Sequence, residues 1–299
     1  MSDAAPIEPL ELEDVPYPYP EKRSRAADLD VCYVDEGTGA VPLLFLPPAG
    51  RSLLHDAKLY APLLAAGYRV IAVDPPGWGK SGKPDATYSI EWYLHWLEHF
   101  VKALGLSRVV LVGSSMGGLL AGTFAARHPA LVAGAALVAP AGGPIPFVKR
   151  QVLGYFLAEE RLRDASPRKW RLALGQYFHR PIPELEELVV RGQRVALSKG
   201  WGAYCRAVSR GGKAVLAFDL ASQLGGLRAP TLLLWGREDR VCPVAWADLF
   251  GKRLSRKRVR ILEGCGHFPS IEDPARVERE LLAWLREDVP DLAPGTAPG

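Results

Sequence analysis

One serine in the chain lies between two glycines at the spacing that a nucleophilic serine needs. After an apolar run that ends at Val112, the sequence is Gly113-Ser114-Ser115-Met116-Gly117-Gly118, followed by a stretch of small residues. This pattern predicts a strand, a sharp turn and a helix, with the serine raised on a strained turn. Side chains two residues before and after it would collide there, so glycine is required at both positions. Ser114 is the adjacent alternative, but Ser115 alone has glycine on both required sides.

The helix expected after Ser115 would direct its positive end toward the serine oxygen. The amide of Met116 lies at that helix start. Negative charge develops beside the serine oxygen during acyl transfer, and an amide aimed there stabilises it. We therefore expect Met116 to be one oxyanion donor.

A serine hydroxyl is a weak nucleophile, so a histidine base and a carboxylate that orients this histidine must be found elsewhere in the chain. His267 lies in Gly264-Cys265-Gly266-His267-Phe268-Pro269, a loop tip unlike the settings of the other histidines. Asp239 follows an apolar run and precedes Pro243, where a loop can carry a carboxylate to the carboxyl edge of a sheet. We prefer Asp239 because the residues up to Pro243 begin the next helix at the expected distance. Three other acids remain as alternatives: Glu238, Asp219 and Glu272.

These three residues need a sheet that brings distant loops together, and the pattern of the chain predicts one. Short β-branched or leucine-rich runs alternate with longer segments of helical period, which is typical of parallel strands joined by helices. Helices are expected after Ser89 and after Asp273-Pro274, an N-cap followed by a proline at the first helical position. The expected strands are Val31–Val34, Leu43–Leu46, Arg69–Val73, Val109–Val112, Ala135–Val138, Thr231–Trp235 and Val259–Leu262.

The alternation is interrupted once, and this divides the chain. Residues 143–226 have the pattern of consecutive helices and are expected to form an inserted cap, with α/β core segments at 28–142 and 227–288. Residues 1–27 are proline-rich and predicted to be an extended surface arm, and 289–299 a flexible tail. Most large apolar groups of the cap should hold its helices together, while a minority form an apolar substrate pocket. They include Phe147, Leu153, Tyr155, Phe156, Trp170, Tyr177, Phe178, Trp201, Tyr204 and Phe218.

Composition narrows the class of partner. The chain is 48% hydrophobic and 23% charged with a net charge of +4, a globular balance that argues against nucleic acid as a partner. The basic cluster between Lys252 and Arg260 is expected to be a solvated surface. The four cysteines lack metal or redox spacing, and His95 with His99 lack a third ligand, so no metal site is expected. A serine nucleophile with a histidine base needs no metal or organic cofactor, and none is expected. No basic start followed by an apolar stretch is present, so we expect neither a signal peptide nor a membrane span, and a cytoplasmic location.

With Ser115 as nucleophile, Asp239 as acid and His267 as base, in that chain order, the sequence resembles the α/β-hydrolase superfamily. The resemblance covers roughly residues 28–287. The family segment Asp-x-x-Gly-x-Gly-x-Ser is matched by Asp74 to Ser81, and Gly-x-x-Asp-x-x-x-Pro by Gly236 to Pro243. Some members place the acid after the sixth strand, but residues 139–144 contain no carboxylate here. The resemblance implies a mostly parallel sheet flanked by helices, and it also favours Asp239.

One departure concerns the second oxyanion donor. The family usually carries His-Gly after its third strand, whereas this chain has Leu46-Pro47-Pro48-Ala49-Gly50-Arg51-Ser52. Prolines have no amide hydrogen to donate. Ala49 matches the usual donor position, and the side chain of Arg51 or Ser52 could supplement it.

By resemblance, a serine at the elbow excludes the dehalogenase and epoxide-hydrolase branches and leaves acyl chemistry. We expect an enzyme that cleaves a carboxylic ester of a small hydrophobic substrate. The Gly-x-Ser-Met-Gly-Gly elbow and Pro-Ala-Gly-Gly at 140–143 are also similar to hydrolases of carbon–carbon bonds in ring-fission products. Cofactor-free haloperoxidases, thioesterases and proline iminopeptidases share the triad, and a non-catalytic small-molecule receptor is a further alternative. Oligomeric state is not predicted.

Overall fold

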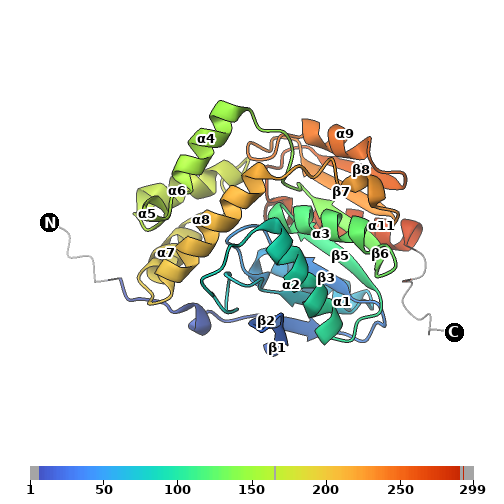
Figure 1. Ribbon diagram of the computed structural model, residues 1–299, viewed down its shortest axis with the longest axis horizontal. Helices are drawn as coiled ribbons and strands as arrows, with labels where there is room; N and C mark the ends of the chain where they lie inside the picture. The colour runs from blue at the N-terminus through green and yellow to red at the C-terminus, as the bar shows by residue number, and fades with distance from the viewer. Residues whose placement is uncertain (1–6, 165, 290–291, 293–299) are drawn as a thin grey trace.

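The computed structural model describes residues 7–164, 166–289 and 292. Eight strands form one sheet in the order β1-β2-β4-β3-β5-β6-β7-β8, with helices on both sides (Figure 1). From β4 to β8 all neighbouring strands are parallel, whereas β1 and β2 pair antiparallel at the edge. The strands are β1 (Lys22–Ala26), β2 (Leu29–Glu36), β3 (Leu43–Leu46), β4 (Val70–Val73), β5 (Val109–Ser114), β6 (Val132–Val138), β7 (Thr231–Gly236) and β8 (Lys257–Leu262).

The central strands are covered on both faces, which explains their continuous apolar sequences. In β3, Leu44 and Leu46 pack on one side, and Leu43 and Phe45 on the other. The first side is covered by α2 (Ile90–Ala103), α3 (Met116–Arg127) and α9 (Ala245–Gly251), and the second by α1 (Ala57–Ala65) and α11 (Pro274–Asp288). The α/β class with a mostly parallel sheet is confirmed.

Two of the six basic residues between Lys252 and Arg260, at the other edge of the sheet, form surface ion pairs. On β8, Arg258 pairs with Glu287 and Asp288 of α11, and Arg260 pairs with Glu280. This agrees with the solvated surface expected for the basic cluster. All four cysteines are buried and free of disulfides.

A layer of helices is inserted between β6 and β7. It comprises α4 (Phe147–Phe156), α5 (Glu159–Leu162), α6 (Pro167–Tyr177), α7 (Leu185–Ala196) and α8 (Trp201–Ala217), grouped at one end of the molecule (Figure 1). The described residues of 143–226 contain no strand, so the expected series of helices is confirmed. We call residues 143–226 the helical segment. Four short helices complete the fold: η1 (Leu12–Asp14), η2 (Leu53–Asp56), η3 (Leu224–Gly226) and α10 (Pro269–Glu272).

The expectation that most large apolar residues hold the helices together is wrong for α4. Phe147, Tyr155 and Phe156 are 64%, 55% and 59% exposed, and α4 has no buried residue. The reason is that α4 contacts the rest of the protein chiefly along one narrow side, facing α8. Its remaining surface faces outward.

The expected surface arm is also partly wrong, because residues 22–26 form β1. This strand pairs with β2 through a two-residue turn in which Ala27 and Asp28 have φ of 49° and 61°. Its sequence, Lys-Arg-Ser-Arg-Ala, lacks the apolar alternation that would have predicted a strand. Of the tail expected at 289–299, Val289 and Leu292 are described and buried, and its other residues lie outside the described ones.

Candidate active site

Ser115 occupies a sharp turn between β5 and α3. Its φ of 54° and ψ of −115° are strained for a residue with a side chain. A Cβ atom on Gly117 would lie 1.9 Å from the carbonyl oxygen of Leu46, and one on Gly113 would lie 2.2 Å from that of Gly117. Both glycines are therefore required sterically, for the reason that the sequence pattern suggested.

Ser115, His267 and Asp239 are joined by hydrogen bonds although they are far apart in the chain. The Oγ of Ser115 lies 3.0 Å from Nε2 of His267, and Nδ1 of His267 lies 2.8 Å from Oδ2 of Asp239. The other carboxylate oxygen of Asp239 accepts the amides of Val241 and Cys242 at 2.8 and 2.9 Å. With Nδ1 donating to the carboxylate, Nε2 is free to accept the serine proton.

The alternative acids have other partners, and the alternative serine has none among the described residues. Glu238 accepts the amide of Gly264 at 2.9 Å, and Asp219 accepts that of Ser222 at 3.3 Å. The Oγ of Ser114 is buried and has no hydrogen-bond partner among the described residues. None of these side chains is hydrogen-bonded to His267 in the described part of the chain.

The loop after β3 lies against the turn that carries Ser115, as its contact with Gly117 shows. Within this loop the amide of Arg51 donates to the carbonyl of Pro48 at 3.0 Å. The hydroxyl of Tyr204, on α8, donates to the carbonyl of Gly50 at 2.6 Å, so α8 fixes the loop. Ala49 lines a cavity beside it. Met116 is the first residue of α3, and its amide has no intrahelical acceptor.

Glu272 has a structural role that sequence reasoning did not predict. One of its carboxylate oxygens accepts the amide of His179 at 2.5 Å and that of Arg180 at 3.4 Å, and the other accepts the amide of Gly266. The amide of His267 in turn donates to the carbonyl of Tyr177 at 2.7 Å. The end of α6 is thus bound directly to the loop that carries His267. No local sequence signal marks this contact, because the bonded residues are up to 93 positions apart.

Asp74 is a second buried carboxylate that organises the surroundings of the site. It accepts the amide of Leu53, which follows the loop after β3, and the amide of Lys80, both at 2.7 Å, together with the hydroxyl of Tyr17. Burial raises the pKa of Asp74 to about 6, although these hydrogen bonds oppose the rise. The match of Asp74 to Ser81 with a family segment is thus explained by loop structure.

Two cavities of about 170 Å³ each lie between the helical segment and the core. Both are mainly apolar and share Gly50, Arg51, Trp170, Trp201 and Tyr204 as lining residues. The guanidinium of Arg51 lies 5.5 Å from the ring centres of Tyr177 and Phe268. Within the described part of the chain it has no ion-pair partner within 4.0 Å, and Asp164 and Lys169 line one of the two cavities together with it.

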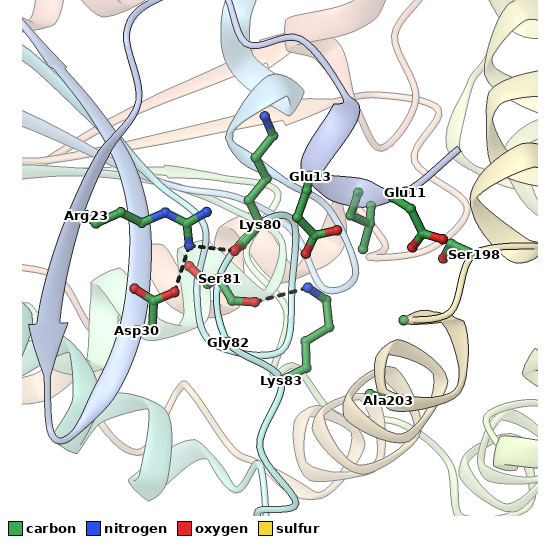
Figure 2. Close-up of a pocket in the computed structure, with 12 residues that line it drawn as sticks. Glu11, Glu13, Arg23, Asp30, Lys80, Ser81, Gly82, Lys83, Ser198 and Ala203 are labelled. Atoms are coloured by element: carbon green, nitrogen blue, oxygen red, sulfur yellow. Dashed lines mark hydrogen bonds and ion pairs between the residues drawn. The ribbon is translucent and has the colours of Figure 1, made fainter. Parts of the chain in front are cut away.

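A larger cavity of about 470 Å³ lies elsewhere, near η1 and the loop after β4 (Figure 2). None of Ser115, Asp239 and His267 lines any of the three cavities, but one of the smaller cavities is lined by Ala49 and by Tyr177, whose ring centre lies 5.9 Å from that of His267. The larger cavity has no such lining residue. Two of its basic side chains bind other lining groups: Arg23 donates to Asp30 at 2.8 Å and to the carbonyl of Lys80 at 3.0 Å, and Lys83 donates to the carbonyl of Ser81 at 3.0 Å. We therefore do not consider it the reaction site.

The described residues offer neither a metal site nor a membrane-spanning helix. They contain no group of three or more His, Cys, Asp or Glu side chains arranged to hold a metal ion. None of their helices is both long enough and apolar enough to span a bilayer.

Comparison with known proteins gives consistent matches along the chain. Residues 41–274 match the family described as alpha/beta hydrolase fold. A 2-hydroxy-6-oxononadienedioate/2-hydroxy-6-oxononatrienedioate hydrolase of Burkholderia vietnamiensis is 30% identical over 87% of this chain and 92% of its own length. Monoacylglycerol lipase ABHD6 of Bos taurus is 29% identical over 87% of this chain and 80% of its own. The crystal structure of a bacterial membrane phospholipase A is 30% identical, with a TM-score of 0.75 and coverage of 89% and 86%.

Proposed function

Because this chain belongs to the α/β hydrolase fold family, we propose that it is a serine hydrolase that cleaves a carboxylic ester of a small hydrophobic substrate. The observation that carries the proposal is the continuous hydrogen-bond chain from Ser115 through His267 to Asp239. We also propose residues 143–226 as a cap, with the domain limits expected from the sequence. The cytoplasmic location stays a prediction.

In the proposed reaction, Ser115 attacks the ester carbonyl while His267 takes its proton through Nε2. Asp239 holds the imidazole in the required tautomer and stabilises the imidazolium. The amides of Met116 and Ala49 stabilise the negative charge on the former carbonyl oxygen. His267 then returns the proton to the leaving alcohol, and water, activated by the same imidazole, releases the acid from Ser115.

The hydrophobic substrate is supported by the cavities that lie between the proposed cap and the core. Trp170, Trp201 and Tyr204 line both of them. Among the similar proteins, the monoacylglycerol lipase and the phospholipase A carry names of ester hydrolases of lipids. An apolar acyl group is therefore the substrate part that suits this site best.

A fluorophosphonate probe tests the proposal directly, because it labels a serine only when a base activates it. We expect the wild-type protein and Ser114→Ala to be labelled and Ser115→Ala not to be labelled. The Ser114 variant is a matched control, since it removes the neighbouring hydroxyl. An unlabelled, folded wild-type protein would instead favour the receptor-like alternative.

A second candidate is hydrolysis of a carbon–carbon bond in a ring-fission diketone, and Arg51 favours it. The Burkholderia vietnamiensis relative is named for an acidic substrate, a dienedioate. The guanidinium of Arg51, which has no ion-pair partner among the described residues, could hold a carboxylate beside the site. A panel of p-nitrophenyl esters and a vinylogous diketone acid separates the two candidates. Turnover of the diketone that exceeds that of the esters, and that Arg51→Gln lowers selectively, would overturn the ester proposal.

A further inference from the structure

The outward side of α4 carries an apolar surface that is largely exposed, although the guanidinium of Arg161 lies over the ring of Tyr155 and that of Arg150 over the ring of Phe147. It is formed by Phe147, Val148, Val152, Tyr155 and Phe156, which are 64%, 72%, 49%, 55% and 59% exposed. We call these five residues the α4 outer face. Figure 1 shows α4 at the outer edge of the molecule, beyond α6 and α8.

The five residues of the α4 outer face are spaced so that they share one side of the helix. At 100° per residue, all five lie within one half of the helix surface, the arrangement of an amphipathic helix. In a globular protein such a stripe normally faces the core, but here Leu153 and Gly154 are the partly buried residues. The apolar side is therefore available to an external partner, and scattered surface apolar residues would not form such a stripe.

The charges around the α4 outer face indicate the chemistry of that partner. Lys149 lies beside the stripe, whereas Arg150 lies on the side that faces α8, between Leu153 and Gly154, with its guanidinium 5.8 Å from the ring centre of Phe147. α4 contains no acidic residue. Arg150 and Lys213 also line an open groove of about 460 Å³ between α4 and α8, together with Tyr155 and Leu216. Lys149, Arg150 and Lys213 are exposed, and none forms an ion pair with a described residue.

We propose that the α4 outer face docks on the surface of an anionic phospholipid bilayer. The apolar and aromatic side chains enter the boundary between headgroups and acyl chains, while Arg150 and Lys213 in the groove bind lipid phosphates. A second copy of this chain fits less well, because pairing two such faces would bring unpaired cations of the same sign together. The inference is independent of the assignment of Ser115 as nucleophile.

Docking would also hold the proposed substrate cavities close to the lipid. Lys213 and Tyr204 lie on the same helix, α8, and Tyr204 lines both cavities. A substrate leaving the bilayer would therefore meet the part of the protein that encloses the site.

Cosedimentation with large unilamellar vesicles tests the proposal. We expect the full-length protein to bind vesicles of phosphatidylcholine with phosphatidylserine, and to be released as salt rises. Phe147→Ser/Val152→Ser/Phe156→Ser should lower the partition coefficient at least about ten-fold. Arg150→Gln/Lys213→Gln should lower it about five-fold per cation at low salt, but should have little effect on vesicles of pure phosphatidylcholine.

The matched control is Val190→Ser/Leu197→Ser, which removes two other exposed apolar side chains, on and just after α7. This variant should bind vesicles like the wild type. All variants should keep their melting temperature and their turnover of a water-soluble p-nitrophenyl ester, which measures the proposed enzyme function separately. Failure of the wild type to bind anionic vesicles would overturn the proposal. So would a dimer in sedimentation velocity that the Phe147 triple variant dissociates, since that result would assign the face to self-association.

Discussion

At the scale of single residues, the adjacent acids Glu238 and Asp239 show how position alone separates two similar groups. The carboxylate of Asp239 is buried between two backbone amides and His267, whereas Glu238 extends to the amide of Gly264. Asp239→Asn should keep the fold but favour the wrong imidazole tautomer, lowering kcat about 10⁴-fold. Glu238→Gln should change kcat less than about three-fold, because its bond to Gly264 does not involve the imidazole.

The two variants should be compared in kcat for one p-nitrophenyl ester, with circular dichroism to check folding. Equal losses of activity in both would contradict the assignment of Asp239. A large loss in Glu238→Gln alone would assign the acid to Glu238.

A second prediction concerns Asp56, a carboxylate that the proposed reaction does not use. It is 5% exposed, and burial raises its pKa to about 7. Its histidine neighbour does not compensate the charge: Nε2 of His55 is 3.9 Å away, and burial holds the pKa of His55 well below its usual range. The folded protein therefore holds the Asp56 proton more tightly than the unfolded chain, so this group's contribution to the free energy of unfolding falls as pH rises from about 4 to 7.

Asp56→Asn should remove this fall in the free energy of unfolding. For a pKa raised from its ordinary value to about 7, the fall is about 4 kcal/mol. Relative to wild type, the variant should become more stable as pH rises from 4 to 8 in urea denaturation. Asp35→Asn is a control, because the hydrogen bond from Arg69 lowers the pKa of Asp35 and the stability gained from this is already complete above the ordinary aspartate pKa of about 4. Between pH 4 and 8 this variant should therefore differ from wild type by an amount that does not change with pH. A difference between Asp56→Asn and wild type that does not depend on pH would contradict the prediction.

At the scale of elements, the β1–β2 hairpin closes one edge of the sheet with a turn that its residues do not favour. Both turn residues have positive φ, which costs a residue with a Cβ about 1–2 kcal/mol, and glycine avoids this cost. Ala27→Gly should therefore raise the free energy of unfolding by about 0.5–1 kcal/mol after the loss of chain entropy is subtracted. Ala103→Gly, at the end of α2, should have the opposite effect, because helical φ suits alanine. Urea denaturation would measure both, and a destabilised Ala27→Gly would contradict the turn geometry.

The β1–β2 hairpin also shows which parts of the fold the sequence does not predict. The central strands were predicted because burial on both faces demands uninterrupted apolar residues, and Leu43–Leu46 was predicted with its observed bounds. The strand β1 was missed because its stability comes from pairing with β2 and not from its polar residues. Similarly, the glycines around Ser115 follow from local sterics, whereas the contact of Glu272 with His179 depends on how the helical segment folds back on the core.

At the scale of the whole molecule, the fold places three distant loops at one edge of the sheet. Ser115 follows β5, Asp239 follows β7 and His267 follows β8, and the carboxyl ends of parallel strands meet at the same edge. The helical segment contacts the third of these loops through the carbonyl of Tyr177 and the carboxylate of Glu272. The position of His267 therefore depends on both parts of the molecule.

Glu272 is accordingly expected to act as a positioning residue. Glu272→Ala leaves the amides of His179, Arg180 and Gly266 without their acceptor, and it loosens the link between the end of α6 and the His267 loop. Because a displacement of about 1 Å in a reacting group can cost about 10²-fold in rate, kcat should fall about ten- to one-hundred-fold.

Glu263→Ala is the matched control: this exposed acid precedes the same loop and pairs with Arg237, so its loss should leave kcat within about two-fold. The decisive measurement is the rate of fluorophosphonate labelling well below the melting temperature of both variants, since a purely stabilising role would lower the melting temperature and leave that rate unchanged. If Glu272→Ala melts earlier but is labelled as fast as Glu263→Ala, the link between the helical segment and the core supports the fold without orienting His267.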